Sequence, residues 1–255
     1  MSSTPDDATA HLLASQAGRL LLALRARASS AGLRAEELRR EGDRLAHQFL
    51  VEELGRLQPH DAILSEEARD DRRRRAVARV WIIDPLDGTR EFAECDRTDW
   101  AVHVALVDHG QLRAGAVALP ARQFTCSTRS PPSPLRRTGG PPCVLVSRTR
   151  PAAEADLVAA AVGGQVEPMG SAGAKTVAVI VGEGDVYVHS GGQHEWDLAA
   201  PAAVALAAGL HVSRLDGSPL RFNQPHPWLP DVLICRPELA PPILAALGAV
   251  TSGRP

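Results

Sequence analysis

Residues 81–89 read Trp-Ile-Ile-Asp-Pro-Leu-Asp-Gly-Thr and carry the strongest structural signal in the chain. Nearly continuous apolar residues from 79 to 84 predict a strand that is buried on both faces. Asp84 and Asp87 stand three residues apart, where the proline between them fixes one backbone angle and the glycine after Asp87 permits a tight turn. Such a turn can aim both carboxylates and the Leu86 carbonyl at one point, an all-oxygen environment that suits Mg²⁺.

Two other acidic segments stand beside predicted secondary structure in the same way. Glu66 belongs to an acidic pair that directly follows a short strand at 62–64, and Asp197 lies near the start of a helix predicted over 197–208. Taken singly, the segments also fit a plain turn, solvated acids at a strand end, and an N-cap aspartate on a core helix. They matter together, because a buried cluster of carboxylates repels itself unless cations compensate the charge.

With these segments in view, the sequence resembles the inositol monophosphatase superfamily of metal-dependent, lithium-sensitive phosphatases. The family signatures are an acidic Gly/Ser-Glu-Glu, then Trp-Ile-Ile-Asp-Pro-Leu/Ile-Asp-Gly-Thr, then Trp-Asp-x-Ala-Ala/Gly. They stand here at 65–67, 81–89 and 196–200, in the same order and at suitable separations. The resemblance runs from about Asp43 to Gly217 and implies a mixed α+β and α/β fold, a layered α-β-α-β-α sandwich of the sugar phosphatase type.

The resemblance also implies an enzyme that uses two or three Mg²⁺ ions, with Asp84 bridging two of them and Asp43 near a weaker third. Thr89, with Glu66 or Asp43, would orient the attacking water, and no covalent phosphoenzyme is needed. Asp43 matches the family by position, whereas the residues before it differ from the family pattern. The predicted catalytic residues are Asp43, Glu66 and Thr89. The predicted metal ligands are Glu66, Asp84, Leu86, Asp87 and Asp197.

Within the superfamily, two details resemble the CysQ-type 3′(2′),5′-bisphosphate nucleotidases. The central motif continues as Arg-Glu-Phe at 90–92, and residues 170–175 resemble a phosphate-contact segment of nucleotidases. The inositol enzymes carry a Glu shortly before Trp-Asp that touches the sugar hydroxyls, whereas this chain reads His-Ser-Gly-Gly at 189–192. The predicted substrate contacts are Gly88, Thr89, Arg148, Ser171, Lys175 and Asp197.

The favoured substrate is a small anionic metabolite, adenosine 3′,5′-bisphosphate. Removal of its 3′-phosphate would give AMP and phosphate and support sulfate assimilation by clearing an inhibitory by-product. One alternative keeps the enzyme class and changes the substrate to inositol phosphates or fructose 1,6-bisphosphate. Another is a non-catalytic protein of the same fold that senses nucleotides, and the complete set of acids argues against it.

Composition excludes some classes of partner. A net charge of −2 is not that of a nucleic-acid-binding protein, and the basic run at 72–75 is interpreted as a solvated loop. The longest early apolar cluster, 20–24, is far too short to cross a membrane. Four cysteines without paired spacing, and a start without a signal peptide, indicate a cytoplasmic protein with reduced thiols. A homodimer is left open.

The pattern of elements predicts two subdomains, an α+β half over 1–128 and an α/β half over 143–255, joined by a proline-rich linker at 129–142. The first half is expected to hold a helix over 7–28, a second helix capped near Asp43, and a β-hairpin over 100–119. Four histidines with no partner visible in the sequence are interpreted as structural or solvent-facing. They are His47, His103, His189 and His194.

Overall fold

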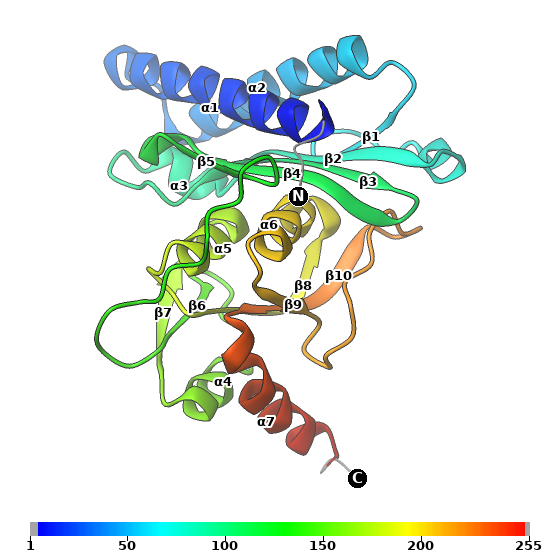
Figure 1. The fold of residues 1–255 in the computed structure, drawn as a ribbon. Coiled ribbons are helices and arrows are strands. Elements are labelled where there is room, and N and C mark those ends of the chain that lie inside the picture. The colour runs from blue at the N-terminus through cyan, green and yellow to red at the C-terminus, as the bar shows by residue number, and fades with distance from the viewer. Residues whose placement is uncertain (1–4, 253–255) are drawn as a thin grey trace.

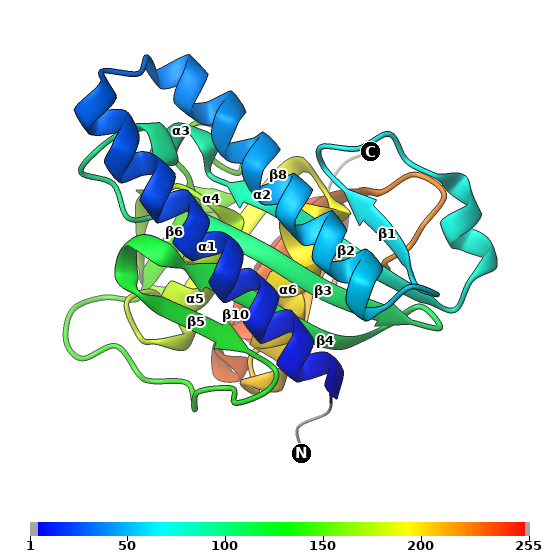
Figure 2. The same cartoon turned by 90° about the horizontal axis from the view of Figure 1, so that it is seen from above.

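Two long helices form the first layer of the fold. In a computed structural model that describes residues 5–252, α1 (Pro5–Ala31) and α2 (Ala35–Leu57) lie side by side over one face of a sheet (Figures 1 and 2). Apolar residues at helical spacing, among them Leu13 and Leu21, face that sheet and are fully buried. The helix predicted over 7–28 is confirmed with longer bounds. Residues 1–4 and 253–255 of the predicted subdomains lie outside the described residues.

The second helix begins eight residues earlier than predicted, so Asp43 lies in its middle and does not cap it. The residues from Ala35 onward, Ala-Glu-Glu-Leu-Arg-Arg-Glu, are strong helix formers. Glu37 also reaches back to accept a hydrogen bond from Arg34 N at 3.3 Å, which closes the first turn. Local propensity therefore overrides the cap that Asp43 suggested.

The first sheet holds five strands from the N-terminal half, in the order β1-β2-β3-β4-β5. β1 pairs with β2 in parallel, and the other neighbours pair antiparallel. The predicted hairpin is confirmed as β3 and β4. The bounds are β1 (Ala62–Ser65), β2 (Arg79–Asp87), β3 (Ala101–Asp108), β4 (Gln111–Leu119) and β5 (Phe124–Ser127).

The second sheet holds five strands from the C-terminal half, in the order β7-β6-β8-β10-β9. β6 pairs in parallel with β7 and β8, whereas β10 runs antiparallel to β8 and β9. The bounds are β6 (Cys143–Ser147), β7 (Gln165–Met169), β8 (Val186–His194), β9 (His211–Ser213) and β10 (Trp228–Cys235).

Helices fill the space between the sheets and cover the outer face of the second. α5 (Ala172–Ile180) and α6 (Glu195–Ala207) lie between the two sheets, and α4 (Ala155–Val162) and α7 (Ala240–Ser252) lie on the far side (Figure 1). The short α3 (Thr89–Ala93) follows β2. The layers run helix, sheet, helix, sheet, helix, which confirms the predicted α-β-α-β-α sandwich.

β2 is buried on both faces, as its apolar run predicts. Trp81 and Ile83 enter the core beneath α1 and α2, whereas Val80 and Ile82 enter the core shared with α5 and α6. Alternate side chains of a strand point to opposite faces, so this one strand takes part in two cores. The acidic residues at its end are therefore attached to a rigid element.

Some elements were not predicted. β5, β7 and β9 are short edge strands, and α7 carries a weak signal because it is apolar on most sides. The helix predicted over 197–208 is α6, which begins two residues earlier, at Glu195, and contains Pro201. Among residues 5–252, no helix has the length and apolar character needed to cross a membrane. The four cysteines form no disulfide within this part of the chain.

Candidate active site

Three acidic segments meet at one edge of the first sheet. The parallel register of β1 and β2 places Glu66 beside Asp84, because both follow the same end of neighbouring strands. The start of α6 carries Asp197 to this point from the layer below (Figure 1). Carboxylate oxygens of Asp84, Asp87 and Asp197 all lie within 4.8 Å of one another. Glu66 joins this acidic centre through a hydrogen bond with Asp84.

A β-bulge in β2 lets two aspartates three residues apart face the same point. Asp84 lies opposite His103 on β3, and Asp87 lies opposite Ala101, so β2 carries one extra residue over this interval. On a regular strand, side chains three residues apart point to opposite faces, and the extra residue removes that mismatch. Leu86 N donates to Asp84 Oδ1 at 3.0 Å and fixes the turn. The strand thus runs through the motif to Asp87 instead of ending at Asp84 as predicted.

One oxygen of Asp87 is surrounded by donors. Oδ2 accepts hydrogen bonds from Ser171 Oγ at 2.5 Å and Gly173 N at 3.0 Å, and His103 Nε2 lies 3.2 Å away. Burial opposes ionisation of Asp87, but His103, Ser171 and Lys175 together hold its pKa at about 2. Oδ1 is therefore the oxygen that remains to bind a metal. His103, interpreted from the sequence as structural or solvent-facing, contacts the acidic centre.

The other acids of the centre are shifted in the opposite direction. Burial, followed by the charges of Glu66 and the two other aspartates, raises the pKa of Asp84 well above its usual range. Burial and Asp87 raise the pKa of Asp197 to about 6. Glu66 keeps an exposed edge, yet partial burial and the charge of Asp197 raise its pKa to about 8. Crowded carboxylates with these shifts fit a divalent cation, which removes their mutual repulsion.

Asp43 and Thr89 flank the acidic centre without belonging to its three-aspartate cluster. α2 packs closely on the motif, because a Cβ at Gly42 would lie 2.9 Å from Leu86 Cδ2. The next residue, Asp43, is half-buried, and burial together with the charge of Glu67 raises its pKa to about 7. Thr89 Oγ1 donates to the Leu86 carbonyl at 3.3 Å. Both predicted catalytic residues therefore lie beside the motif, on different elements.

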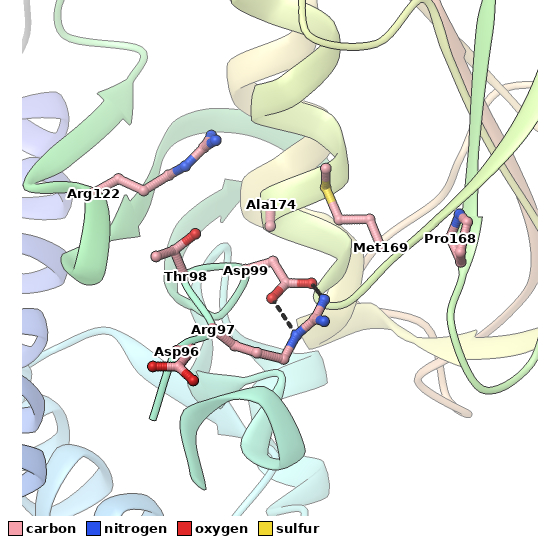
Figure 3. A pocket seen from close by; sticks show the side chains of 8 residues that line it. All are labelled: Asp96, Arg97, Thr98, Asp99, Arg122, Pro168, Met169 and Ala174. Atoms are coloured by element: carbon pink, nitrogen blue, oxygen red, sulfur yellow. Dashed lines mark hydrogen bonds and ion pairs between the residues drawn. The ribbon is translucent and has the colours of Figure 1, made fainter. Parts of the chain in front are cut away.

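A tight contact joins the turn at Gly88 to the loop before β3. Gly88 takes a φ of +85°, and a Cβ there would lie 3.2 Å from Asp99 O, so glycine is required on both counts. Asp99 Oδ2 accepts from Gly170 N at 2.6 Å and pairs with Arg97 (Figure 3). The adjoining cavity of about 280 Å³ is lined by Asp96, Arg97, Thr98, Asp99, Arg122, Pro168, Met169 and Ala174. None of these lining residues belongs to the acidic centre, so the cavity is not the active site.

Lys175 and Arg148, which the sequence predicts as substrate contacts, make contacts within the protein. Lys175 is buried, and its Nζ donates to the carbonyls of Gly170 at 3.1 Å and Ser171 at 2.7 Å. Burial lowers the pKa of this amine to about 8. Arg148 pairs with Glu91 and Glu94, both at 2.8 Å. Lys175 thus holds the loop that carries Ser171, whose φ of +45° is unusual for a residue other than glycine.

Arg150 is the basic residue that the sequence analysis missed. It is exposed, and within residues 5–252 no carboxylate lies within ion-pair distance of it. Its charge reaches the site, because it lowers the pKa of His194 together with burial and opposes the upward shift of Asp197. In the sequence Ser-Arg-Thr-Arg at 147–150, nothing distinguishes this arginine from Arg148.

The basic run at 72–75 is not solvated throughout, which corrects the sequence interpretation. Arg74 is fully buried and donates to Asp70 at 2.7 and 3.0 Å, to Asn223 Oδ1, and to Gln224 O at 2.8 Å. The carboxylate of Glu195 accepts from the backbone N–H groups of the same two residues, at 2.6 and 2.8 Å. Arg74 thus connects the loop that follows Glu66 to the start of α6.

Comparison with known protein families assigns this architecture. A model of the inositol monophosphatase family matches residues 4–250. The chain belongs to the inositol monophosphatase family. The family predicted from the three acidic motifs is confirmed, and so is the fold that it implies.

Individual relatives narrow the resemblance within the family. The chain is 48% identical to a 3′-phosphoadenosine 5′-phosphate phosphatase of Mycobacterium leprae, over 96% of this chain and 94% of that protein. It is 33% identical to the 3′(2′),5′-bisphosphate nucleotidase CysQ of Escherichia coli, over 71% and 78% of the two chains. The crystal structure of CysQ from Bacteroides thetaiotaomicron matches with a TM-score of 0.75 and 26% identity, over 90% and 96%. The predicted nucleotidase branch agrees with these names.

Proposed function

We propose that this chain removes the 3′-phosphate of adenosine 3′,5′-bisphosphate and releases AMP and phosphate. The observation that carries the proposal is the acidic centre, where three carboxylates with crowded oxygens meet at the end of a doubly buried strand. The names of relatives up to 50% identical support the bisphosphate substrate. The glycine pair near 191–192, in place of the Glu expected of inositol enzymes, supports it further.

The proposal includes two or three Mg²⁺ ions. Glu66, Asp84 and the Leu86 carbonyl would hold one ion, and Asp84, Asp87 and Asp197 would hold a second. Asp43 and Glu66 are the proposed ligands of a weaker third. Bound Mg²⁺ supplies positive charge that stabilises the phosphoryl oxygens and the leaving alkoxide as negative charge builds on them.

Thr89 and Glu66 orient the water that attacks phosphorus. Thr89 Oγ1 donates its own proton to Leu86 O, which leaves the hydroxyl oxygen free to accept a hydrogen bond from that water. The carboxylate of Glu66 accepts the second hydrogen bond, so two protein groups hold one water in one orientation. Asp43 stays our prediction as a further contact on the same side.

Arg150 is the proposed contact of the phosphate that is not removed, because it is exposed and its charge opposes the upward shift of the Asp197 pKa. A guanidinium can bind a phosphate through two parallel hydrogen bonds. Gly88 and Thr89 remain proposed contacts of the phosphate that leaves. Ser171, Lys175 and Arg148 act behind the site, where they fix the loop that holds Asp87.

We further propose a cytoplasmic protein of two subdomains, 1–128 and 143–255, that supports sulfate assimilation. Millimolar Li⁺ is expected to inhibit it, and full activity at such concentrations would contradict the metal assignment.

Phosphate release with Mg²⁺ tests the function directly. kcat/KM is compared for adenosine 3′,5′-bisphosphate, inositol 1-phosphate and fructose 1,6-bisphosphate. A preference for the nucleotide of about tenfold or more, which corresponds to about 1.4 kcal/mol, supports the proposal. Comparable values would indicate a broad phosphatase, and no release from any substrate would favour a nucleotide-sensing protein.

A further inference from the structure

An exposed aromatic cluster lies beside the acidic centre. The rings of His194 and Trp196 stack at 4.4 Å with an angle of 7° between their planes, and Trp228 meets His194 edge-on at 5.1 Å. Trp228 is 48% exposed, although a tryptophan of a folded protein is highly buried on average. Large aromatic surfaces left open to solvent mark sites where another molecule binds.

The cluster is attached to a proposed metal ligand. His194 N donates to Asp197 Oδ2 at 2.7 Å, and Trp196 follows His194 by two residues at the start of α6. Trp228 begins β10 and lies opposite His194 in the antiparallel pairing with β8. Any substrate whose phosphate reaches Asp197 therefore places its other end near these rings.

The glycine pair in β8 creates room for the indole. Gly192 takes a φ of +91°, which disfavours other residues, and a Cβ there would lie 1.6 Å from Trp228 Cζ2, so a side chain at 192 would displace the indole. The indole rests against the backbone at Gly192 while nearly half of its surface stays open. At the place where inositol enzymes carry a Glu for sugar hydroxyls, this chain thus presents an aromatic ring.

We infer that Trp228, with the ring of His194, is the stacking surface for the adenine base of the substrate. The inference rests on the proposed function and deepens it, because it explains why a nucleotide binds in place of a cyclic polyol. A planar aromatic face attracts a base through stacking but offers a sugar ring no hydrogen bonds.

Equilibrium binding tests the inference without turnover. AMP and ribose 5-phosphate, which lacks the base, are titrated calorimetrically in the presence of Mg²⁺ against the wild type and three variants. Trp228→Ala should weaken AMP binding about 5- to 150-fold and leave ribose 5-phosphate unchanged, as expected for the loss of one stacked base. Trp228→Phe should recover most of the affinity for AMP. Phe124→Ala, which removes another exposed aromatic ring far away on β5, is the matched control and should behave as wild type.

Other outcomes separate the inference from the proposed function. Unchanged AMP affinity in Trp228→Ala, or equal weakening of both ligands, would overturn the stacking surface. The KM for adenosine 3′,5′-bisphosphate should rise in the same variant with little change in kcat, because stacking serves ground state and transition state alike. A wild type that binds AMP through Trp228 but does not hydrolyse the bisphosphate would refute the proposed function and leave the stacking surface standing. Failure of AMP to bind the wild type would overturn the inference.

Discussion

Replacement of Arg74 by Met should destabilise the protein and weaken its metal binding together. The substitution leaves the carboxylate of Asp70, the side-chain oxygen of Asn223 and the carbonyl of Gln224 without their buried donor. Breaking a buried ion pair costs about 3–5 kcal/mol, and Asp70 is 26% exposed, so we expect about 3 kcal/mol. For a chain of this size, that loss lowers the melting temperature by roughly 6–12 °C.

The matched control is Arg73→Met, one residue away. The Arg73 side chain is 91% exposed and, among residues 5–252, forms an ion pair only with Asp71, so its loss should leave the melting temperature unchanged. Thermal unfolding is measured by circular dichroism, and metal affinity by titration of Mn²⁺ followed by electron paramagnetic resonance. Because Arg74 connects the loop after Glu66 to the start of α6, its loss should also raise the dissociation constant for Mn²⁺ several-fold. If Arg74→Met had the same melting temperature and the same dissociation constant for Mn²⁺ as Arg73→Met, the proposed role of Arg74 in linking the loop after Glu66 to α6 would be refuted.

Three further predictions concern the acidic centre. Asp87→Asn should nearly abolish turnover while the circular dichroism spectrum stays native, and near-normal activity would rule out Asp87 as a metal ligand. Ser171→Ala removes the 2.5 Å hydrogen bond to Asp87 and should weaken Mg²⁺ binding about 10- to 100-fold, as the loss of a residue that orients a ligand typically does; unchanged affinity by calorimetry would contradict this. Metal binding needs ionised carboxylates, and the pKa values of Asp197 and Glu66 stand at about 6 and 8. Half-saturation by Mg²⁺ should therefore require more metal as the pH falls from 8 to 6, and a flat profile would argue that these groups do not bind the ion.

Local motifs in the sequence identified the chemistry of the site, because the spacing of Asp84 and Asp87 and the strand before them are encoded within nine residues. Parallel pairing and the bulge in β2 then decide how the carboxylates face each other, and neither has a local signature. Ser171 and Asp87 are 84 residues apart, and no pattern in the sequence links them.

The sequence did not reveal which charged side chains are buried in the fold. Within the basic run at 72–75, the fully buried Arg74 has the same chemical identity as its solvated neighbours, and two of its partners, Asn223 and Gln224, lie about 150 residues away. Lys175, which the sequence predicts as a substrate contact, is buried and donates to three carbonyls of its own segment, those of Met169, Gly170 and Ser171. Arg148 forms ion pairs with Glu91 and Glu94, whereas Arg150, two residues later, stays exposed. Long-range contacts, which composition and periodicity do not encode, determine each outcome.

The carboxylates of the acidic centre differ in pKa: that of Asp87 is lowered and that of Asp84 is raised. Asp87 is ionised strongly because Ser171, Gly173 and His103 converge on one of its oxygens. Asp84 has no such set of donors, and burial beside like charges raises its pKa. Burial beside like charges thus favours the protonated form of Asp84, whereas the donors around Asp87 favour its ionised form. A divalent cation held by these carboxylates would favour ionisation of the other acids, because its positive charge would offset their mutual repulsion. Ser171 and Gly173, which donate to Asp87, belong to the same loop and helix as Lys175, so one segment carries both sets of contacts.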